Sequence, residues 1–174
     1  YCFGENANSE LADGGTTDQS APVNIASGYN DVKLGLYHGC ALSTGNEIAC
    51  WGYDNYGEVG NNNPGNPNTT PQDFLLDTTP TNYSDAQSIA LGDYHSCLID
   101  SDQRFMCWGL GLNGQLGNSL NENIDSIHDP YAGALAPISS TIVYEPGATT
   151  EINFTKIDAG IDFTCALTDQ GRIM

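Results

Sequence analysis

The sequence predicts an all-β protein made of three consecutive repeats, and two observations support this. Residues 88–117 align without a gap over residues 31–60, and both copies contain Leu-Gly, Tyr-His, two cysteines, Cys-Trp-Gly and a closing Gly-x-x-Gly. Within each copy the apolar residues form short runs between polar, turn-forming residues, as in strands, and no long amphipathic helix is visible. We expect one unit over residues 1–174, with repeats at about 3–50, 51–107 and 108–174.

Each of the two complete copies predicts a β-hairpin. In the later copy one strand is expected over residues 88–92, and another begins at Cys97. A polar turn at residues 100–103 then leads to an apolar run that contains Cys107. The two cysteines fall on opposing strands, where cross-strand side chains lie within reach of a disulfide. We therefore predict disulfides Cys97–Cys107 and, from the same spacing in the earlier copy, Cys40–Cys50.

The third copy is divided between the two ends of the sequence. Its first half begins at Lys156 and stops at Met174, in the position just before the second cysteine of the repeat. Its other half opens the chain, where Cys2-Phe3-Gly4 stands for Cys-Trp-Gly and residues 1–4 are expected to form the strand that completes a terminal sheet. Variable stretches rich in Asn, Pro, Thr and Ser, such as residues 61–71 and 118–146, are interpreted as linkers.

Half a hairpin at each end predicts association, because an unpaired strand edge invites another strand to complete the sheet. We expect consecutive chains to share a sheet head to tail, with Cys165 of one chain bonded to Cys2 of the next. Two chains closing into one ring is a second arrangement. The alternative is that the sequence is an excerpt of a longer polypeptide that itself supplies the missing strands.

The charge of the chain excludes several kinds of partner. The net charge is −18, from 22 acidic and 4 basic residues. Binding to nucleic acid or to anionic lipid depends on Lys and Arg, so we expect no nucleic-acid partner. No apolar run is long enough to form a membrane helix, and we expect no membrane insertion.

The six cysteines bear on the compartment. No Cys-x-x-Cys pair suggests a zinc site, and disulfides persist in oxidising compartments. A secreted, extracellular or cell-surface location is therefore expected, and the sequence is interpreted as a mature or excised piece of an exported protein. Glycosylation sequons begin at Asn68, Asn82 and Asn153, two of them in the linkers.

The repeat pattern Leu-Gly-x-Tyr-His-x-Cys-x-Leu, a short turn, then Cys-Trp-Gly-x-x-x-x-Gly-x-x-Gly resembles the RCC1 (RCC1/BNR-like) family, in its exported, cysteine-containing variety. The best match runs from Trp108 to Gly117. The resemblance implies a β-propeller, typically of seven blades, each a four-stranded antiparallel sheet. Three such blades, the third split between the termini, cannot close that ring alone. The family's chromatin and nucleotide-exchange functions cannot be carried over, because the repeat motif does not mark their residues.

Several residues at fixed repeat positions look functional but are interpreted as structural. His38 and His95 share one position and resemble a metal pair, yet Phe163 fills the same position in the third copy, so no metal site is predicted. Trp51 and Trp108 are expected in the core, because large aromatic residues at a repeat position serve packing.

Surface loops are the better source of binding residues. Calcium at the oxygen-rich segments 54–55 and 121–125 is a weaker alternative to turn formation, since no EF-hand spacing is present, and no cofactor is expected. No catalytic motif is found, and the protein is predicted not to be an enzyme. Candidate contacts to a partner are the loop tyrosines Tyr29, Tyr53, Tyr56, Tyr83, Tyr131 and Tyr144.

These observations lead to two hypotheses about function. The first is a non-enzymatic extracellular structural protein, whose propeller-type repeats assemble head to tail by sharing a blade into a filament or scaffold. Its partners are copies of itself or a longer chain of the same repeats. The alternative is a protein-binding or inhibitory β-propeller, of which this chain is a three-repeat part and which takes a protein ligand.

Overall fold

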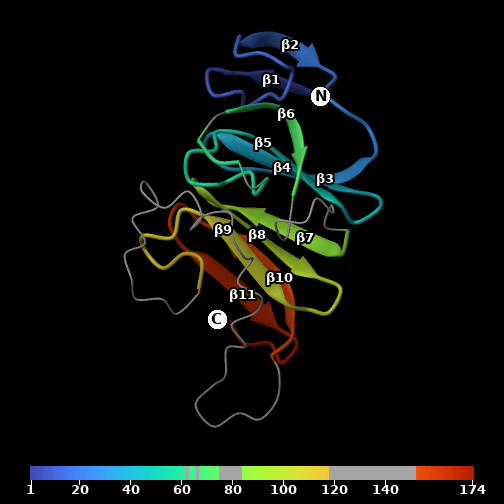
Figure 1. Cartoon of the computed structure of the whole chain (residues 1–174). Coiled ribbons are helices and arrows are strands. Elements are labelled where there is room, and N and C mark those ends of the chain that lie inside the picture. Colours follow the sequence, from blue (N-terminus) through green and yellow to red (C-terminus); the bar gives the residue numbers. More distant parts are fainter. Residues whose placement is uncertain (62, 66, 75–83, 118–151) are drawn as a thin grey trace.

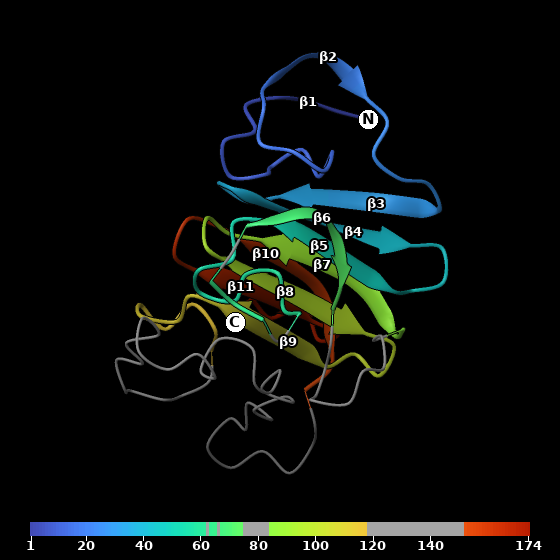
Figure 2. The ribbon, with the colours of Figure 1, turned by 45° about the horizontal axis from the view of Figure 1, so that its top comes forward.

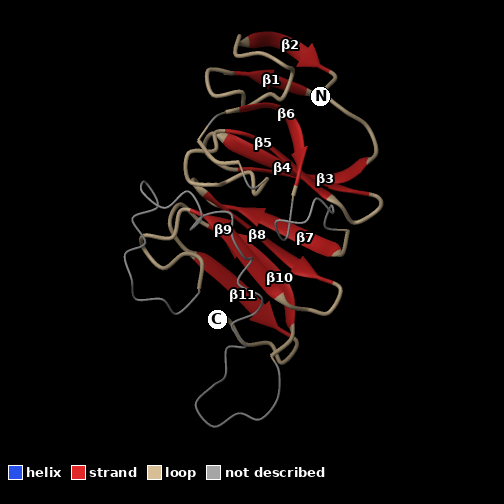
Figure 3. Cartoon of the chain, viewed as in Figure 1, coloured by secondary structure: helices blue, strands red, loops and turns tan. Residues whose placement is uncertain are grey.

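The structure is a computed structural model that describes residues 1–61, 63–65, 67–74, 84–117 and 152–174. Among these residues the regular elements are β-strands, drawn in red in Figure 3, and every strand pair is antiparallel. Within the described ranges no helix is long and apolar enough to cross a membrane. The predicted all-β class is confirmed.

The described strands form four sheets. The first sheet pairs β1 with β2, the second has the order β3-β4-β5-β6, the third β7-β8-β9 and the fourth β10-β11. A bridge between Leu167 and Ile173 extends the fourth sheet. The strands are β1 (Cys2–Gly4), β2 (Gln19–Val23), β3 (Tyr29–Leu34), β4 (His38–Ser43), β5 (Ile48–Gly52), β6 (Asn68–Asp73), β7 (Ala86–Leu91), β8 (His95–Asp100), β9 (Phe105–Gly109), β10 (Phe154–Ala159) and β11 (Thr164–Thr168).

The four sheets follow one another in space in the order of the chain. Figure 1 shows the first sheet at the top and β10 and β11 below, with the second and third sheets between them. The turned view of Figure 2 keeps the first sheet beyond β3, away from β10 and β11. The first and fourth sheets are thus the outermost, and each holds two named strands. This is the divided third copy that the sequence predicts.

The outer strand of the second sheet was not expected from the sequence. Residues 61–71 were interpreted as a linker, but β6 begins at Asn68 and pairs with β5. The linker interpretation is therefore wrong for Asn68–Pro71. The segment Asn-Thr-Thr-Pro-Gln-Asp lacks the apolar alternation of a half-buried strand, and Pro71 lies where proline is tolerated, on a strand with one neighbour. The other expected linker, residues 118–146, lies outside the described residues.

The hairpin register agrees with the predicted phase of the repeat. Cys40 lies opposite Cys50, and Ala41 lies opposite Ala49. In the fourth sheet Ala166 and Met174 exchange two backbone hydrogen bonds, of 3.0 and 2.9 Å. Met174 therefore holds the place of Ala49, one residue before the second cysteine of the repeat.

The repeat limits at 50/51 and 107/108 fall inside β5 and β9. The second and third sheets therefore each take their strands from two neighbouring sequence repeats. The division into three repeats within one unit of residues 1–174 stays a prediction.

The core lies between neighbouring sheets. Trp51 and Trp108 are each 4% exposed, which confirms their expected place in it. Phe74 packs on Trp108 with ring centroids 4.3 Å apart. The largest group of buried apolar residues joins the second sheet to the third and consists of Cys40, Leu42, Ile48, Cys50, Val59, Phe74, Ala86, Ile89, Leu91, Leu98, Met106 and Trp108.

Candidate functional site

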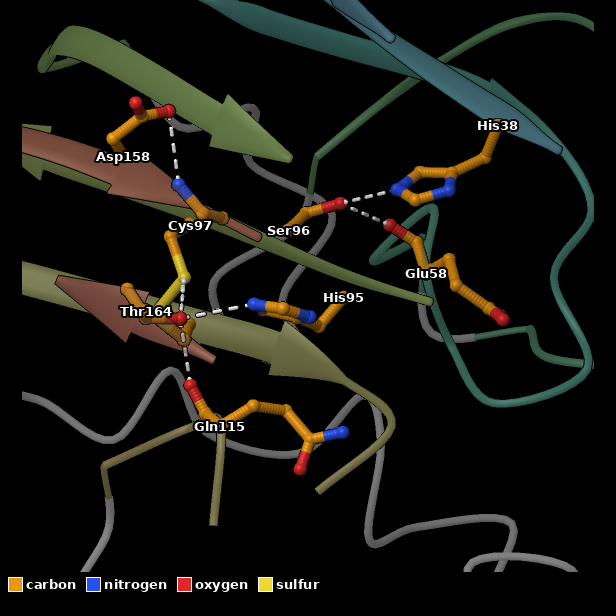
Figure 4. The surroundings of a disulfide bond; sticks show 10 residues. His38, Glu58, His95, Ser96, Cys97, Gln115, Asp158 and Thr164 are labelled. Carbon is orange, nitrogen blue, oxygen red and sulfur yellow. Dashed lines mark hydrogen bonds between the residues drawn. A yellow bond between two sulfur atoms is a disulfide. The ribbon is translucent and has the colours of Figure 1, made fainter. Parts of the chain in front are cut away.

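Two buried histidines link the second sheet to the third and the third sheet to the fourth. The Nε2 atom of His38 on β4 lies 2.9 Å from the hydroxyl of Ser96 on β8. His95 repeats this contact, at 2.9 Å, with Thr164 on β11. Figure 4 shows both contacts beside the Cys97 disulfide. The sequence predicted packed or hydrogen-bonded strand residues at His38 and His95, and the structure confirms it.

The hydroxyl groups determine the state of these histidines. Ser96 donates its proton to the backbone carbonyl of Glu58 at 3.0 Å, and Thr164 donates to that of Gln115 at 2.8 Å. Each hydroxyl has one proton, so it must accept from the imidazole, which carries hydrogen on Nε2. Burial lowers the pKa of His38 to about 3 and lowers the pKa of His95. Both rings are therefore neutral at physiological pH.

The two tryptophans donate to backbone carbonyls at this same repeat position, Glu58 and Glu10. Trp108 Nε1 donates to the carbonyl of Glu58 at 2.8 Å, and Trp51 Nε1 donates to that of Glu10 at 2.7 Å. Sequence reasoning missed this use of Glu58, and it also missed Ser96. A visible signal was the position after the histidine, which is Gly, Ser or Thr in the three copies.

Two buried carboxyl groups lie in the loop after β5. Asp54 accepts hydrogen bonds from the Val59 amide at 3.0 Å and from Asn68 Nδ2 at 2.9 Å. Glu58 accepts from the Tyr56 amide at 2.8 Å, and its other carboxyl oxygen is buried without a hydrogen-bond partner. Burial raises the pKa of Asp54 to about 7 and that of Glu58 to about 8.

These contacts bear on the calcium alternative. Both carboxyl oxygens of Asp54 accept hydrogen bonds, and Asn55 donates to the Tyr53 hydroxyl at 2.7 Å. The pair therefore serves the loop itself, as the turn-forming interpretation expects. The second oxygen-rich segment, residues 121–125, lies outside the described residues.

Another acidic group was not anticipated. Carboxyl oxygens of Asp85, Asp100 and Asp102 lie within 4.8 Å of one another. Arg104 binds this group, at 2.7 Å from Asp100 and 3.1 Å from Asp102. The guanidinium supplies a positive charge to these carboxylates, and no further ligand is indicated here.

Four half-buried tyrosines form a cluster at one end of the second and third sheets. We define the tyrosine cluster as Tyr37, Tyr53, Tyr56 and Tyr94. Tyr94 lies 5.8 to 6.1 Å, between ring centroids, from each of the other three. Tyr53 has contacts of 6.1 Å to Tyr37 and Tyr56. Burial raises the pKa of Tyr53 and of Tyr94, so both phenols are neutral at physiological pH.

The cluster contains some of the predicted contact residues and adds others. The sequence singled out Tyr53 and Tyr56, and the structure brings them together with Tyr37 and Tyr94, which sequence reasoning assigned to the repeat motif alone. Tyr29 lies apart, at the start of β3. The remaining candidates, Tyr83, Tyr131 and Tyr144, lie outside the described residues.

The cysteines divide into two classes. The structure joins Cys40 to Cys50 and Cys97 to Cys107, with Cα atoms 4.1 Å apart in each pair, as the spacing predicts. Cys2 is half-buried and Cys165 is exposed, and neither is bonded. They belong to the first and fourth sheets, which lie at opposite ends of the stack (Figure 1). A bond between Cys2 and Cys165 of different chains stays a prediction.

The described sequons begin at half-buried asparagines. Asn68 donates its side-chain amide to Asp54, inside the loop described above. Asn153 donates to the exposed Asp169 at 3.2 Å. The third sequon, at Asn82, lies outside the described residues.

Comparison with known proteins agrees with this architecture. Two family models, both described as Regulator of chromosome condensation (RCC1) repeat, match residues 23–58 with 86–115 and residues 48–99, and together they span more than half of the chain. The human probable E3 ubiquitin-protein ligase HERC4 is 31% identical over 157 residues, covering 87% of this chain and 13% of that protein. The ultraviolet-B receptor UVR8 of Arabidopsis thaliana is 25% identical over 176 residues, covering 98% of this chain and 35% of the receptor.

Solved structures show the same fold at low sequence identity. Human WBSCR16 superposes with a TM-score of 0.72 at 15% identity, over 98% of this chain and 40% of that one. Yeast RCC1 (Prp20), solved in complex with Kap60, gives a TM-score of 0.68 at 20% identity, over 98% of this chain and 38% of that one. The chain thus spans well under half of each relative. Its repeated sheets, their antiparallel order and the matched family models together show that this chain belongs to the RCC1 repeat family of β-propeller proteins.

Proposed function

We propose that this chain is the protein-binding part of an RCC1-type β-propeller and that the tyrosine cluster is its contact surface. The observation that carries the proposal is the gathering of Tyr37, Tyr53, Tyr56 and Tyr94 on three loops at one end of adjacent blades. Tyrosine supplies a large, stiff contact area with a hydroxyl at its edge, and it is enriched among the residues that dominate binding energy. Rigid strands hold the loops that carry these rings, which limits the entropy lost on binding.

The relatives support a protein as the class of partner. A solved structure of yeast RCC1 (Prp20) contains Kap60, and a second report on Prp20p describes its binding to Gsp1p and histones. Those partners belong to those proteins. For this chain the likeness supports only the class of ligand, a protein.

A non-catalytic role fits the buried polar groups. The distance between His38 Nε2 and the Ser96 hydroxyl would suit a catalytic base and its nucleophile. Both residues, however, are buried, at 3% and 0% exposure. Ser96 gives its proton to a backbone carbonyl, so the imidazole has no proton to withdraw. Thr164 does the same beside His95.

We further propose that the protein is exported, because two disulfides on adjacent strands would not persist in a reducing cytosol. Peptide mapping of the native protein without reduction should recover both pairs. Free thiols at these positions would refute the exported location. Intact mass before and after glycan removal tests whether any of the sequons at Asn68, Asn82 and Asn153 carries a glycan.

The binding proposal is tested by quantitative capture on the immobilised chain. Proteins from the native source are compared between the wild type and a Tyr53→Ser/Tyr94→Ser variant. Tyr29→Ser is the matched control, since Tyr29 lies outside the cluster. A partner that the cluster variant loses and the control retains supports the proposal. Partners held equally by all three proteins would show that the contact surface lies elsewhere.

A second candidate function, head-to-tail assembly, is favoured by exposed apolar residues on the first sheet and on β3 of the second sheet. Phe3 is 64% exposed, whereas its counterpart Trp108 is 4% exposed. Leu34 on β3 is 66% exposed, whereas its counterpart Leu91 on β7 is 9% exposed. Each exposed residue occupies a position that elsewhere packs between two sheets. Phe3 and Leu34 would become buried in the same way if a neighbouring blade covered them.

The residues at the histidine position suggest that this neighbour is a second copy. His38 faces the hydroxyl of Ser96, and His95 faces that of Thr164. Phe163, in the fourth sheet, has no polar atom and requires an apolar or small residue opposite. The corresponding position in the second sheet is Gly39, which has no side chain. A fourth sheet completed by β1 and β2 of another copy would bring Phe163 of one chain toward Gly39 of the next.

Denaturing electrophoresis tests the assembly after incubation with oxidised glutathione, which accepts the two electrons and two protons released when two thiols form a disulfide. A ladder in multiples of 18.5 kDa that collapses on reduction, and that Cys165→Ser abolishes, supports a bond between Cys165 and Cys2. A single larger native band that survives reduction would mean that a longer chain supplies the missing strands. A monomer in both lanes would refute the covalent link.

A further inference from the structure

The loops that carry the tyrosine cluster also carry a consistent charge. Tyr37 and Tyr94 occupy one repeat position in successive sheets, and Asp162 occupies it in the fourth sheet. Backbone hydrogen bonds join this row of loops, from Leu36 to Asp93 at 3.4 Å and from Asp93 to Ile161 at 3.2 Å. Asp93 is half-buried beside Tyr94, and Asp162 is exposed. The row thus runs from aromatic rings to carboxylates.

The described loops at this end of the sheets lack basic residues, and Lys33, the next-to-last residue of β3, is paired with Asp31 at 3.2 Å. Loops 35–37, 53–60, 92–94 and 160–163 contain no Lys or Arg. The four basic residues lie on strands or at the opposite end of the sheets: Lys33 on β3 beside Asp31, Lys156 on β10, and Arg104 and Arg172 in the turns that follow β8 and β11. A partner that approaches these loops therefore meets negative charge and aromatic rings, with the exposed aliphatic side chains of Leu36 and Ile161 between them, and no basic side chain of the loops themselves.

We propose that the tyrosine cluster, with Asp93 and Asp162, binds a basic segment of a protein partner through its Lys and Arg side chains. This inference rests on the proposed function and names the chemistry of its ligand. The face of a tyrosine ring attracts an ammonium or guanidinium group, and the aliphatic stem of the same side chain packs on the ring. Asp93 and Asp162 pair with the charge, and the net charge of −18 speeds the approach of a cation from a distance.

An acidic or a purely apolar segment would gain less at the same surface. An acidic segment would face carboxylates with no basic residue in these loops to neutralise it. An apolar segment would cover the tyrosine hydroxyls, including the Tyr53 hydroxyl that accepts from Asn55, without offering them a polar partner. Only the basic segment satisfies the rings, the hydroxyls and the carboxylates together.

The test measures binding of a labelled peptide of alternating Arg and Gly to the full chain by fluorescence anisotropy, at ~0.15 M salt. The same peptide with citrulline or with Glu in place of Arg is the reference. We expect the Arg peptide to bind at least tenfold more tightly than either. Tyr94→Leu, which keeps apolar bulk but removes the ring, should weaken binding about tenfold, and Tyr29→Leu should have no effect.

Two variants with the same change in net charge distinguish binding at the tyrosine cluster from general attraction to an acidic protein. Asp93→Asn lies beside the cluster, and Asp169→Asn lies in the exposed turn at the opposite end of the fourth sheet. The proposal requires a larger loss of affinity for Asp93→Asn. Equal losses for both variants, or no loss for Tyr94→Leu, would overturn it. If the Arg peptide fails to bind while a captured partner still depends on Tyr53 and Tyr94, the basic ligand is refuted and the proposed protein-binding function stands.

Discussion

Replacing Glu58 by Gln tests the assignment of a buried, uncharged carboxyl group to the loop after β5. Glu58 is fully buried, and one of its carboxyl oxygens has no hydrogen-bond partner. Gln115 occupies the same position in the next repeat, where its side chain accepts from the Asn113 amide at 2.8 Å. The chain itself therefore shows that glutamine can make the loop contact.

The expected effect depends on pH in a defined direction. The pKa of Glu58 is raised from 4.5 to about 8, so the folded state keeps a proton that the unfolded state releases. Wild-type stability therefore falls as pH rises from about 4.5 to about 8 and then levels off. Each pH unit in that window corresponds to about 1.4 kcal/mol, so across the whole window the stability of Glu58→Gln relative to wild type should rise by about 5 kcal/mol. A constant cost of about 1 to 3 kcal/mol for the buried amide N–H groups shifts the curve without changing its slope.

Urea unfolding followed by the fluorescence of Trp51 and Trp108 measures this difference at about pH 5, 7 and 9. Glu10→Gln is the control, because Glu10 holds the same repeat position in the first sheet but is half-buried. The reasoning requires that the stability difference for Glu58→Gln change more with pH than the difference for Glu10→Gln. If the difference between Glu58→Gln and wild type were the same at all three pH values, Glu58 would not be a buried neutral acid and the reasoning would fail.

Three further predictions concern the fold and the charge. Replacing Cys97 and Cys107 together by Ala should lower the free energy of unfolding by about 3 kcal/mol, measured in urea, because the disulfide limits the unfolded chain; a variant as stable as wild type would contradict this. Thr164→Val should cost about 1 to 3 kcal/mol in the same assay, because His95 Nε2 and the Gln115 carbonyl both lose a buried hydrogen bond; an unchanged unfolding curve would show that water replaces the hydroxyl. Labelled DNA and RNA should show no specific binding at ~0.15 M salt, because a protein with a net charge of −18 repels the phosphates; a micromolar complex in a filter or anisotropy assay would refute the prediction that nucleic acid is not a partner.

Much of the fold could be predicted because its signals are local and repeated. The alignment of residues 31–60 with 88–117 carries the strand order of each hairpin, and the ten-residue spacing of Cys40 and Cys50 places them on opposing strands. β6 was not predicted, because an outer strand buries too little apolar surface to show an alternating pattern. Pairing with its neighbouring strand, and not its own sequence pattern, determines its conformation.

The candidate site was harder to predict because its residues meet only between sheets. The sequence repeats mark His38 and Tyr94 as motif positions. They do not reveal that the Ser96 hydroxyl lies opposite His38 or that three tyrosine rings surround Tyr94.

By itself the sequence determined the all-β class, the hairpin register, the core tryptophans and the acidic surface, since each depends on neighbours along the chain or on composition. The tertiary structure alone decided that Glu58 is a buried acid and that four tyrosines from three loops share one surface, because packing of one blade on the next creates both environments.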